Sequence, residues 1–172
     1  MRVLCIPFER SPQQITTLPE REPMIAEATP AEYSVAAQIH AMAQVAYTLE
    51  AERIGCADFP PLRESLEELR QSSDSFLVFQ QSGSIIGGLS FHRSTDAVAI
   101  TRLIVSSGHL RQGIATALLS ELETRLFPMT RLTVSTAAAN TPAISLYKRF
   151  GFTTDSASTS AEGISLLHLV KA

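Results

Sequence analysis

Apolar and polar residues alternate along the chain in two distinct patterns. Short apolar runs bounded by turn residues are typical of strands, and longer segments whose apolar residues recur every three or four positions are typical of helices. The clearest helical stripe begins at Val35 and continues through Ile39 and Met42. The patterns predict strands at residues 24–28, 76–80, 85–92, 97–105, 132–136, 152–154 and 164–170, and helices at residues 29–54, 62–70, 114–127 and 140–150.

Local residue choices predict where several of these elements begin and end. Thr29 and Glu32 have the spacing of a capping box, and Pro30 suits the first helical position. Ser82-Gly83 predicts a hairpin turn between two strands. Pro128 is expected to end the third long helix, because proline lacks the amide hydrogen that a helix interior uses.

The order of the predicted elements is typical of an α/β protein with helices on both faces of one mixed sheet. Residues 24–172 are expected to form a single domain of this kind, since the chain of 172 residues is long enough to bury one core. Residues 1–23 carry prolines and little periodicity, so they are expected to form an irregular extension.

Composition narrows the classes of function. The net charge is −3 and no long basic run occurs, so the sequence gives no electrostatic reason to expect nucleic acid or an anionic membrane as a partner. Cys5 and Cys56, and the lone His92 and His109, lack metal-ligand spacing, so no metal site is expected. Two unpaired cysteines favour free thiols in a reducing cytoplasm.

A loop between a strand and a helix carries the first candidate chemistry. The apolar strand that includes Leu103 and Val105 breaks at Ser106, and Gly113 then precedes an amphipathic helix. The first amides of a helix have no internal partner, and the positive end of the helix dipole favours a phosphate group. Taken alone, this segment is equally consistent with a turn that uses glycine only for its geometry.

A second segment follows the strand at residues 132–136. Asn140 or Thr141 can cap a helix that Gly151 would end, and Pro142 lies near the first turn. Asn140 and Tyr147 are close to two turns apart, so they fall near one face of the helix. Without further context, Asn140 could be only a cap and Tyr147 only a core residue.

Together the two segments resemble the GNAT superfamily of N-acetyltransferases over about residues 24–170. The second segment matches the signature Asn-x-x-Ala-x-x-x-Tyr-x-x-x-Gly-Phe at every specified position. The first resembles the pyrophosphate loop, Arg/Gln-x-x-Gly-x-Gly/Ala, but has Leu110 at the first position and a basic residue, Arg111, at the next. The resemblance implies a GNAT-like sandwich with a mostly antiparallel sheet of about six to seven strands and a splayed cofactor cleft.

The resemblance also implies site residues. Acetyl-CoA would lie in the cleft, with its pantetheine arm paired to the backbone of Leu103 and Val105, hydrogen-bonded to Asn140 and packed near Phe150. Tyr147 would act as the general acid that protonates the departing thiolate. The backbone amides that would hold the pyrophosphate are those of Arg111, Gln112, Gly113, Ile114, Ala115 and Thr116.

The sequence leaves several candidates for the general base and does not identify the acceptor. The strand at residues 97–105 contains no carboxylate, so Glu50, Glu52, His92 or a water molecule are the alternatives for the base. Tyr47 is suited either to the core or to the acceptor pocket, which we expect to include the loops at residues 55–61, 93–96 and 155–163. The acceptor implied by the resemblance is an amine of a small molecule or peptide, and a homodimer is one oligomeric state that it allows. The alternative is a non-catalytic acyl-CoA-binding or sensor module, which the missing strand carboxylate favours and Tyr147 opposes.

Overall fold

The computed structural model describes residues 22–126 and 131–172. Its seven strands form one sheet in the order β1-β2-β3-β4-β5-β7-β6, and every neighbouring pair is antiparallel except β4 and β5. The elements in chain order are β1 (Met24–Ala28), α1 (Tyr33–Ile54), the 3-10 helix η1 (Pro60–Arg63), α2 (Leu66–Arg70), β2 (Ser75–Gln81), β3 (Ser84–Arg93), β4 (Ala97–Val105), the 3-10 helix η2 (Ser107–His109), α3 (Ile114–Leu126), β5 (Arg131–Ala137), α4 (Thr141–Arg149), β6 (Thr153–Thr159) and β7 (Ser165–Lys171). This architecture confirms the mixed α/β fold predicted from the sequence.

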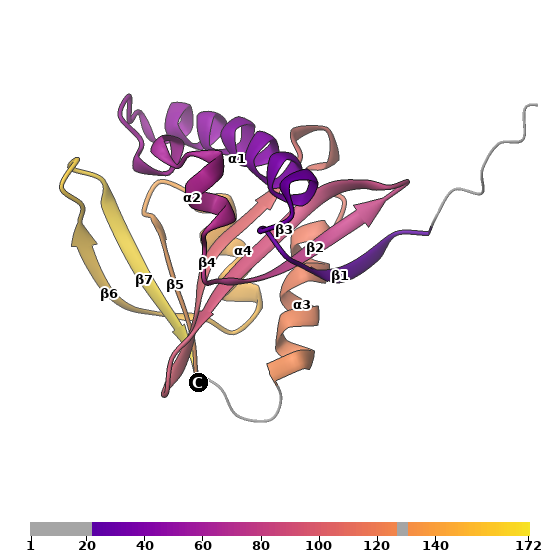
Figure 1. The fold of residues 1–172 in the computed structure, drawn as a ribbon. Coiled ribbons are helices and arrows are strands. Elements are labelled where there is room, and N and C mark those ends of the chain that lie inside the picture. The colour runs from indigo at the N-terminus through magenta and orange to yellow at the C-terminus, as the bar shows by residue number, and fades with distance from the viewer. Residues whose placement is uncertain (1–21, 127–130) are drawn as a thin grey trace, which may run out of the picture.

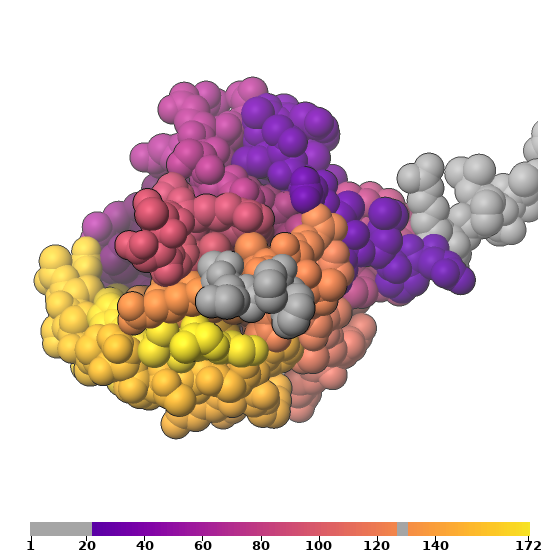
Figure 2. Space-filling view, turned by 90° about the horizontal axis from the view of Figure 1, so that it is seen from below, coloured from indigo at the N-terminus to yellow at the C-terminus, as the bar shows by residue number. Residues whose placement is uncertain are grey.

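Helices cover both faces of the sheet (Figure 1). Helices α1 and α2 pack on one face, where Ile39 and Leu69 join a buried cluster with residues of β2–β4. Helices α3 and α4 pack on the other face, where Leu118 and Leu146 belong to the larger cluster. Seen from below, the N-terminal helices and the C-terminal strands lie on opposite sides of the molecule (Figure 2). The central strands β2, β3 and β4 are therefore largely buried between two apolar layers, whereas every residue of β6 is exposed.

The two parallel strands separate part-way along their length. Strands β4 and β5 pair only from Ala97 and Arg131 to Ile100 and Val134, although β4 continues to Val105. The two strands diverge toward the end of the sheet at the top of Figure 1, where α1 lies. Beyond the last pair, each strand exposes a backbone edge to the gap, so this is where the fold offers hydrogen-bonding groups to a ligand.

Some predicted boundaries are wrong. The capping box at Thr29 does not form: α1 begins after Glu32, whose side chain makes no capping bond. The complete capping box lies instead at Ser65 and Glu68, which start α2. The helix predicted at residues 62–70 is split into η1 and α2, because the chain at Glu64 is extended.

Strand β6 is longer than predicted. Its exposed serines and threonines show no alternation of apolar and polar residues, so the sequence does not mark it as a strand. It is a strand because it pairs with β7. Residues 1–21 of the predicted extension lie outside the described residues. Pro128, which is expected to end a helix, also lies outside them. Within the described ranges, no helix is both long enough and apolar enough to cross a membrane.

Candidate active site

A cavity of about 440 Å³ lies where β4 and β5 separate. It receives residues from α1, from the segment leading into η1, from β4, β5 and α4, and from the turn between β6 and β7. Its lining includes residues of two of the three loops expected to form the acceptor pocket, at positions 59–61 and 160–162, but none at positions 93–96. The cavity thus joins the gap between the strands to the surface beside α1.

Tyr147 lies on α4 and lines this cavity with a ring that is only 4% exposed. The ring packs edge-on against Phe152, with centroids 5.4 Å apart. No hydrogen bond to the Tyr147 hydroxyl occurs within the described part of the chain. Burial, together with the negative charge of Glu50 and the nearby Tyr47, raises the pKa of Tyr147 well above its usual range. The hydroxyl is therefore a protonated and uncommitted donor at neutral pH.

Asn140 connects α4 to α1. Its side-chain oxygen accepts a hydrogen bond from the Ala143 amide at 3.4 Å and caps α4, as the sequence predicted. Its Nδ2 donates to Glu50 Oε1 at 2.8 Å. Asn140 is 9% exposed, and this part-buried hydrogen bond holds the Glu50 carboxylate at the cavity wall.

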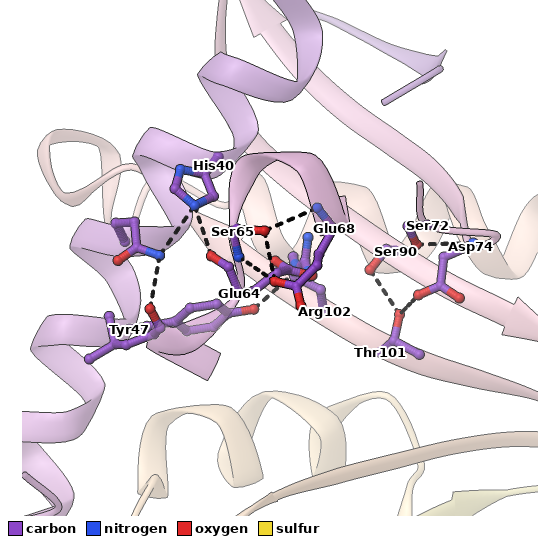
Figure 3. Close-up of polar contacts among 12 residues, drawn as sticks. His40, Tyr47, Glu64, Ser65, Glu68, Ser72, Asp74, Ser90, Thr101 and Arg102 are labelled. Atoms are coloured by element: carbon purple, nitrogen blue, oxygen red, sulfur yellow. Dashed lines mark hydrogen bonds and ion pairs between the residues drawn. The ribbon is translucent and has the colours of Figure 1, made fainter. Parts of the chain in front are cut away.

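A buried ion pair lies beside the same cavity (Figure 3). The Nη2 of Arg102 on β4 donates to both carboxylate oxygens of Glu64 at 2.8 Å, and its Nε donates to the Tyr47 hydroxyl at 3.1 Å. The guanidinium lies over the Phe76 ring at 5.7 Å. These contacts tie β4 to α1 and to the segment between η1 and α2, and they neutralise the one ionisable residue of β4.

A second, more exposed carboxylate lines the cavity from the β6–β7 turn. Glu162 accepts a hydrogen bond from Arg63 Nη1 at 3.5 Å. The same guanidinium makes closer contacts with Asp58, through Nε at 3.0 Å and through Nη2. The cation is thus shared, and Asp58 is its principal partner.

The loop after β4 has the geometry expected of an anion site. Arg111 has a φ of +61° and Gly113 has a φ of +84°, a backbone conformation that favours glycine. The Ala117 amide makes the first helical hydrogen bond to the Gly113 carbonyl at 2.9 Å, so the amides of residues 114–116 precede the helix ladder. A Cβ placed on Gly113 would meet no heavy atom within 4 Å, which leaves room for a diphosphate.

The predicted site residues form two groups in the structure. Leu103, Asn140 and Tyr147 line the cavity. Val105 and the loop residues 111–116 lie outside its lining, at the end of β4 and the start of α3. Phe150 also lies outside it, where it ends α4 and packs on the larger core cluster.

Of the residues considered for the general base, Glu50 alone lines the cavity. Glu52 is exposed on α1 and is not part of the lining, and His92 lies outside it with its Nδ1 3.4 Å from Asp74. Tyr47 lines the cavity, and burial raises its pKa despite the adjacent Arg102. Sequence reasoning missed the Arg102–Glu64 pair, for which no sequence motif exists.

The described residues contain no group of three or more histidine, cysteine, aspartate or glutamate side chains arranged to hold a metal ion. The loop after β4 and the free edge of that strand fit a nucleotide thioester such as acetyl-CoA. A diphosphate would lie against the amides at the start of α3, and an extended arm would lie along the β4 edge beyond Ile100.

Comparison with known proteins agrees with this geometry. The chain is 33% identical over 140 residues to the UPF0157 protein YqkA of Bacillus subtilis (strain 168), a match that covers 80% of this chain and 41% of that protein. The chain therefore spans less than half the length of this relative.

Solved acetyltransferase structures share the fold. The ribosomal-protein-alanine N-acetyltransferase from Brucella melitensis superposes with a TM-score of 0.65 at 21% identity, covering 86% of this chain and 98% of that one. The PaiA N-acetyltransferase from Thermoplasma acidophilum, solved in complex with coenzyme A, gives a TM-score of 0.68 at 16% identity, with 84% and 98% coverage. A profile of the acetyltransferase (GNAT) family matches residues 37–152, which include both sequence motifs, the cavity's strands and Tyr147. The chain belongs to the acetyltransferase (GNAT) family.

Proposed function

We propose that this chain transfers an acetyl group directly from acetyl-CoA to an amine of a small molecule or peptide. The observation that carries the proposal is the cavity at the β4–β5 separation, where a buried tyrosine and a held carboxylate line one space. The thioester supplies an activated acetyl carbon, and the residues around it must remove one proton and deliver another.

Tyr147 is proposed as the general acid. As the amine nitrogen bonds to the acetyl carbon and the carbon–sulfur bond breaks, the sulfur needs a proton. The Tyr147 hydroxyl can donate it, because a phenol is protonated at neutral pH and no other described group accepts its hydrogen. Tyr147 and Glu50 both line the cavity.

Glu50 is proposed as the general base that takes the proton from the amine. The carboxylate lines the cavity, and the hydrogen bond from Asn140 fixes its orientation without neutralising its charge. Asn140 then acts as a positioning residue for the base. The contact predicted between Asn140 and the pantetheine arm would use its second Nδ2 hydrogen, because its oxygen caps α4.

The proposal is tested by mixing purified protein with acetyl-CoA and a panel of amines and following the release of free thiol. Glu50→Gln should lower kcat by about 10²-fold or more, because a positioned base typically contributes about 10²–10⁴-fold. Glu52→Gln is the matched control, since Glu52 lies on the same helix outside the cavity. Equal activity of the two variants would remove Glu50 from the mechanism.

The competing hypothesis is a module that binds acyl-CoA without turnover. It is favoured by the absence of a carboxylate from β4, where Arg102 is the ionisable residue. Measuring acetyl-CoA binding together with thiol release distinguishes the two hypotheses. Tight acetyl-CoA binding with no thiol release from any amine would support the module.

A further inference from the structure

The charges on the cavity wall point to a class of acceptor. The lining that comes from α1, from residues 59–61 and from residues 160–166 is here called the acceptor wall, and its apolar part consists of Phe59, Pro60, Pro61, Ile164 and Leu166. Its charged part consists of Glu50 and Glu162, which approach from α1 and from the β6–β7 turn. An acceptor here would meet an apolar surface between two carboxylates.

Arg102 is the one cation among the residues that line the cavity, and its Nε and Nη2 are already engaged by protein partners. Its Nη2 is bound to both oxygens of Glu64, and its Nε is bound to Tyr47. Its Nη1 has no hydrogen-bond partner and lies beneath the solvent-accessible surface. A carboxylate on the acceptor would therefore find no bidentate partner on this wall.

The buried tyrosine of the cavity is also unsuited to an acceptor carboxylate. Tyr147 is 4% exposed and its hydroxyl has no partner among the described residues, yet it lies next to Glu50. A second carboxylate beside Glu50 would be repelled at short range in a partly desolvated site, where such interactions are strongest. A protonated amine would instead be attracted by the same group.

We infer that the acceptor wall selects amines that carry no carboxylate near the reacting nitrogen, such as simple amines, amino-acid amides and peptide N-termini, over free amino acids. This inference rests on the proposed function. Glu50 receives the amine, the apolar part of the wall holds the adjoining carbon skeleton, and Glu162, which shares Arg63 with Asp58, adds negative potential at the entrance. The Arg102–Glu64 pair excludes the carboxylate by keeping the guanidinium occupied.

The test compares two acceptors that differ only in this group, phenylalanine amide and phenylalanine, at saturating acetyl-CoA. The kcat/KM ratio of amide to acid, measured by thiol release, should be at least about tenfold, as expected for one close like-charge contact. In Glu162→Gln the ratio should fall by at least about threefold, most clearly at low ionic strength. Glu52→Gln removes the same charge from outside the cavity and should leave the ratio unchanged.

A second variant tests the role of the ion pair. Glu64→Gln keeps the shape of the side chain but frees the Arg102 guanidinium, so it should raise kcat/KM for phenylalanine and reduce the ratio. If Glu64→Gln does not fold, Glu162→Gln alone decides the question. The inference is overturned if wild type uses phenylalanine as well as its amide, if the ratio is unchanged in both variants, or if neither acceptor reacts. Acetyl-CoA binding, followed separately by thermal unfolding, shows whether the proposed function fails at the same time.

Discussion

Tyr147 and Glu50 reach the same cavity from helices on opposite faces of the sheet. Tyr147 comes from α4 and Glu50 from α1, and the gap between β4 and β5 is what allows both side chains to line one space. Burial leaves the tyrosine neutral, and a single hydrogen bond from Asn140 holds the glutamate.

Tyr147→Phe should reduce kcat by about 10²–10⁴-fold while leaving acetyl-CoA affinity within about threefold, because it removes only the donated proton. The ring should stay packed on Phe152, so the fold is preserved. Tyr33→Phe is the matched control, since Tyr33 is 65% exposed at the start of α1. Steady-state thiol release and equilibrium binding measure the two effects, and full activity in Tyr147→Phe would exclude the proposed acid.

The raised pKa of Tyr147 gives an expectation for the pH profile. A folded-state pKa above the unfolded value keeps the hydroxyl protonated as the pH rises, so the acid stays competent through the alkaline range. We expect kcat to show no descending limb below about pH 9.5, since an unperturbed tyrosine titrates near 10. Rates corrected for spontaneous thioester hydrolysis check this, and a descending limb centred near pH 8 would contradict it.

At the scale of elements, the packing of α3 on β3 depends on one glycine. A Cβ on Gly87 would stand 2.5 Å from Ile114 Cγ2 and 3.2 Å from Leu118 Cδ1, and both of these side chains are buried. Ile114 is the first residue of α3, so a side chain at position 87 would push the helix start away from the sheet. The position of the loop before α3, which we propose binds the diphosphate, therefore depends on strand β3 as well as on its own sequence.

Gly87→Ala should lower the free energy of unfolding by about 1–3 kcal/mol, the usual cost of overpacking a core. It should also weaken acetyl-CoA binding. Gly88→Ala is the control, because its Cβ would meet Met42 and Ile104 at an ordinary 3.6 and 3.7 Å. Denaturant unfolding and equilibrium binding compare the two variants, and equal behaviour would contradict this role of Gly87.

Gly113→Glu should abolish acetyl-CoA binding, because it places a side chain and a negative charge where the diphosphate would lie. The substitution also strains the backbone, whose φ is +84°. Gly151→Glu controls for this strain, since Gly151 has a φ of +85° at the far end of α4. Retention of binding in Gly113→Glu would mean that the anion site lies elsewhere.

At the scale of the whole molecule, the cleft divides the sheet into two parts. Strands β1–β4 carry α1 and α2, while β5, β7 and β6 form the other part, and beyond Ile100 no strand pairing joins the two. What crosses the gap is the Asn140–Glu50 hydrogen bond and the contact of Arg63 with Glu162. A ligand lying in the gap would add further contacts to both parts and should stabilise the folded chain.

Acetyl-CoA at about a hundredfold its Kd should raise the free energy of unfolding by about 2.7 kcal/mol. For a chain of this size, that corresponds to a rise in Tm of roughly 5–10 °C. Free CoA should give a comparable rise and acetate should give none, because the expected contacts lie along the nucleotide and its arm. A thermal unfolding series reports all three, and a rise with acetate alone would contradict the proposed cleft.

Residues with strong local requirements were predictable. Gly113 follows from the backbone that a strand-to-helix loop needs, and Asn140 follows from the capping of α4. The capping box at Thr29 was a misleading local signal, because the chain there makes a turn in which the Glu32 amide bonds to the Thr29 carbonyl instead. Strand β6 could not be given its true length, because its exposed residues take their structure from β7.

The sequence by itself therefore determined the family, the order of elements, the loop before α3 and the candidate acid Tyr147. Each of these depends on residues close together in the chain, where periodicity, caps and glycine geometry act. Only the tertiary structure decided that the Glu50 carboxylate reaches the cavity and that the Arg102 guanidinium is paired with Glu64. Asn140 and Glu50 are 90 residues apart, and Arg102 and Glu64 are 38 apart. Contacts of that kind are set by how the helices pack across the sheet, and no local pattern encodes them.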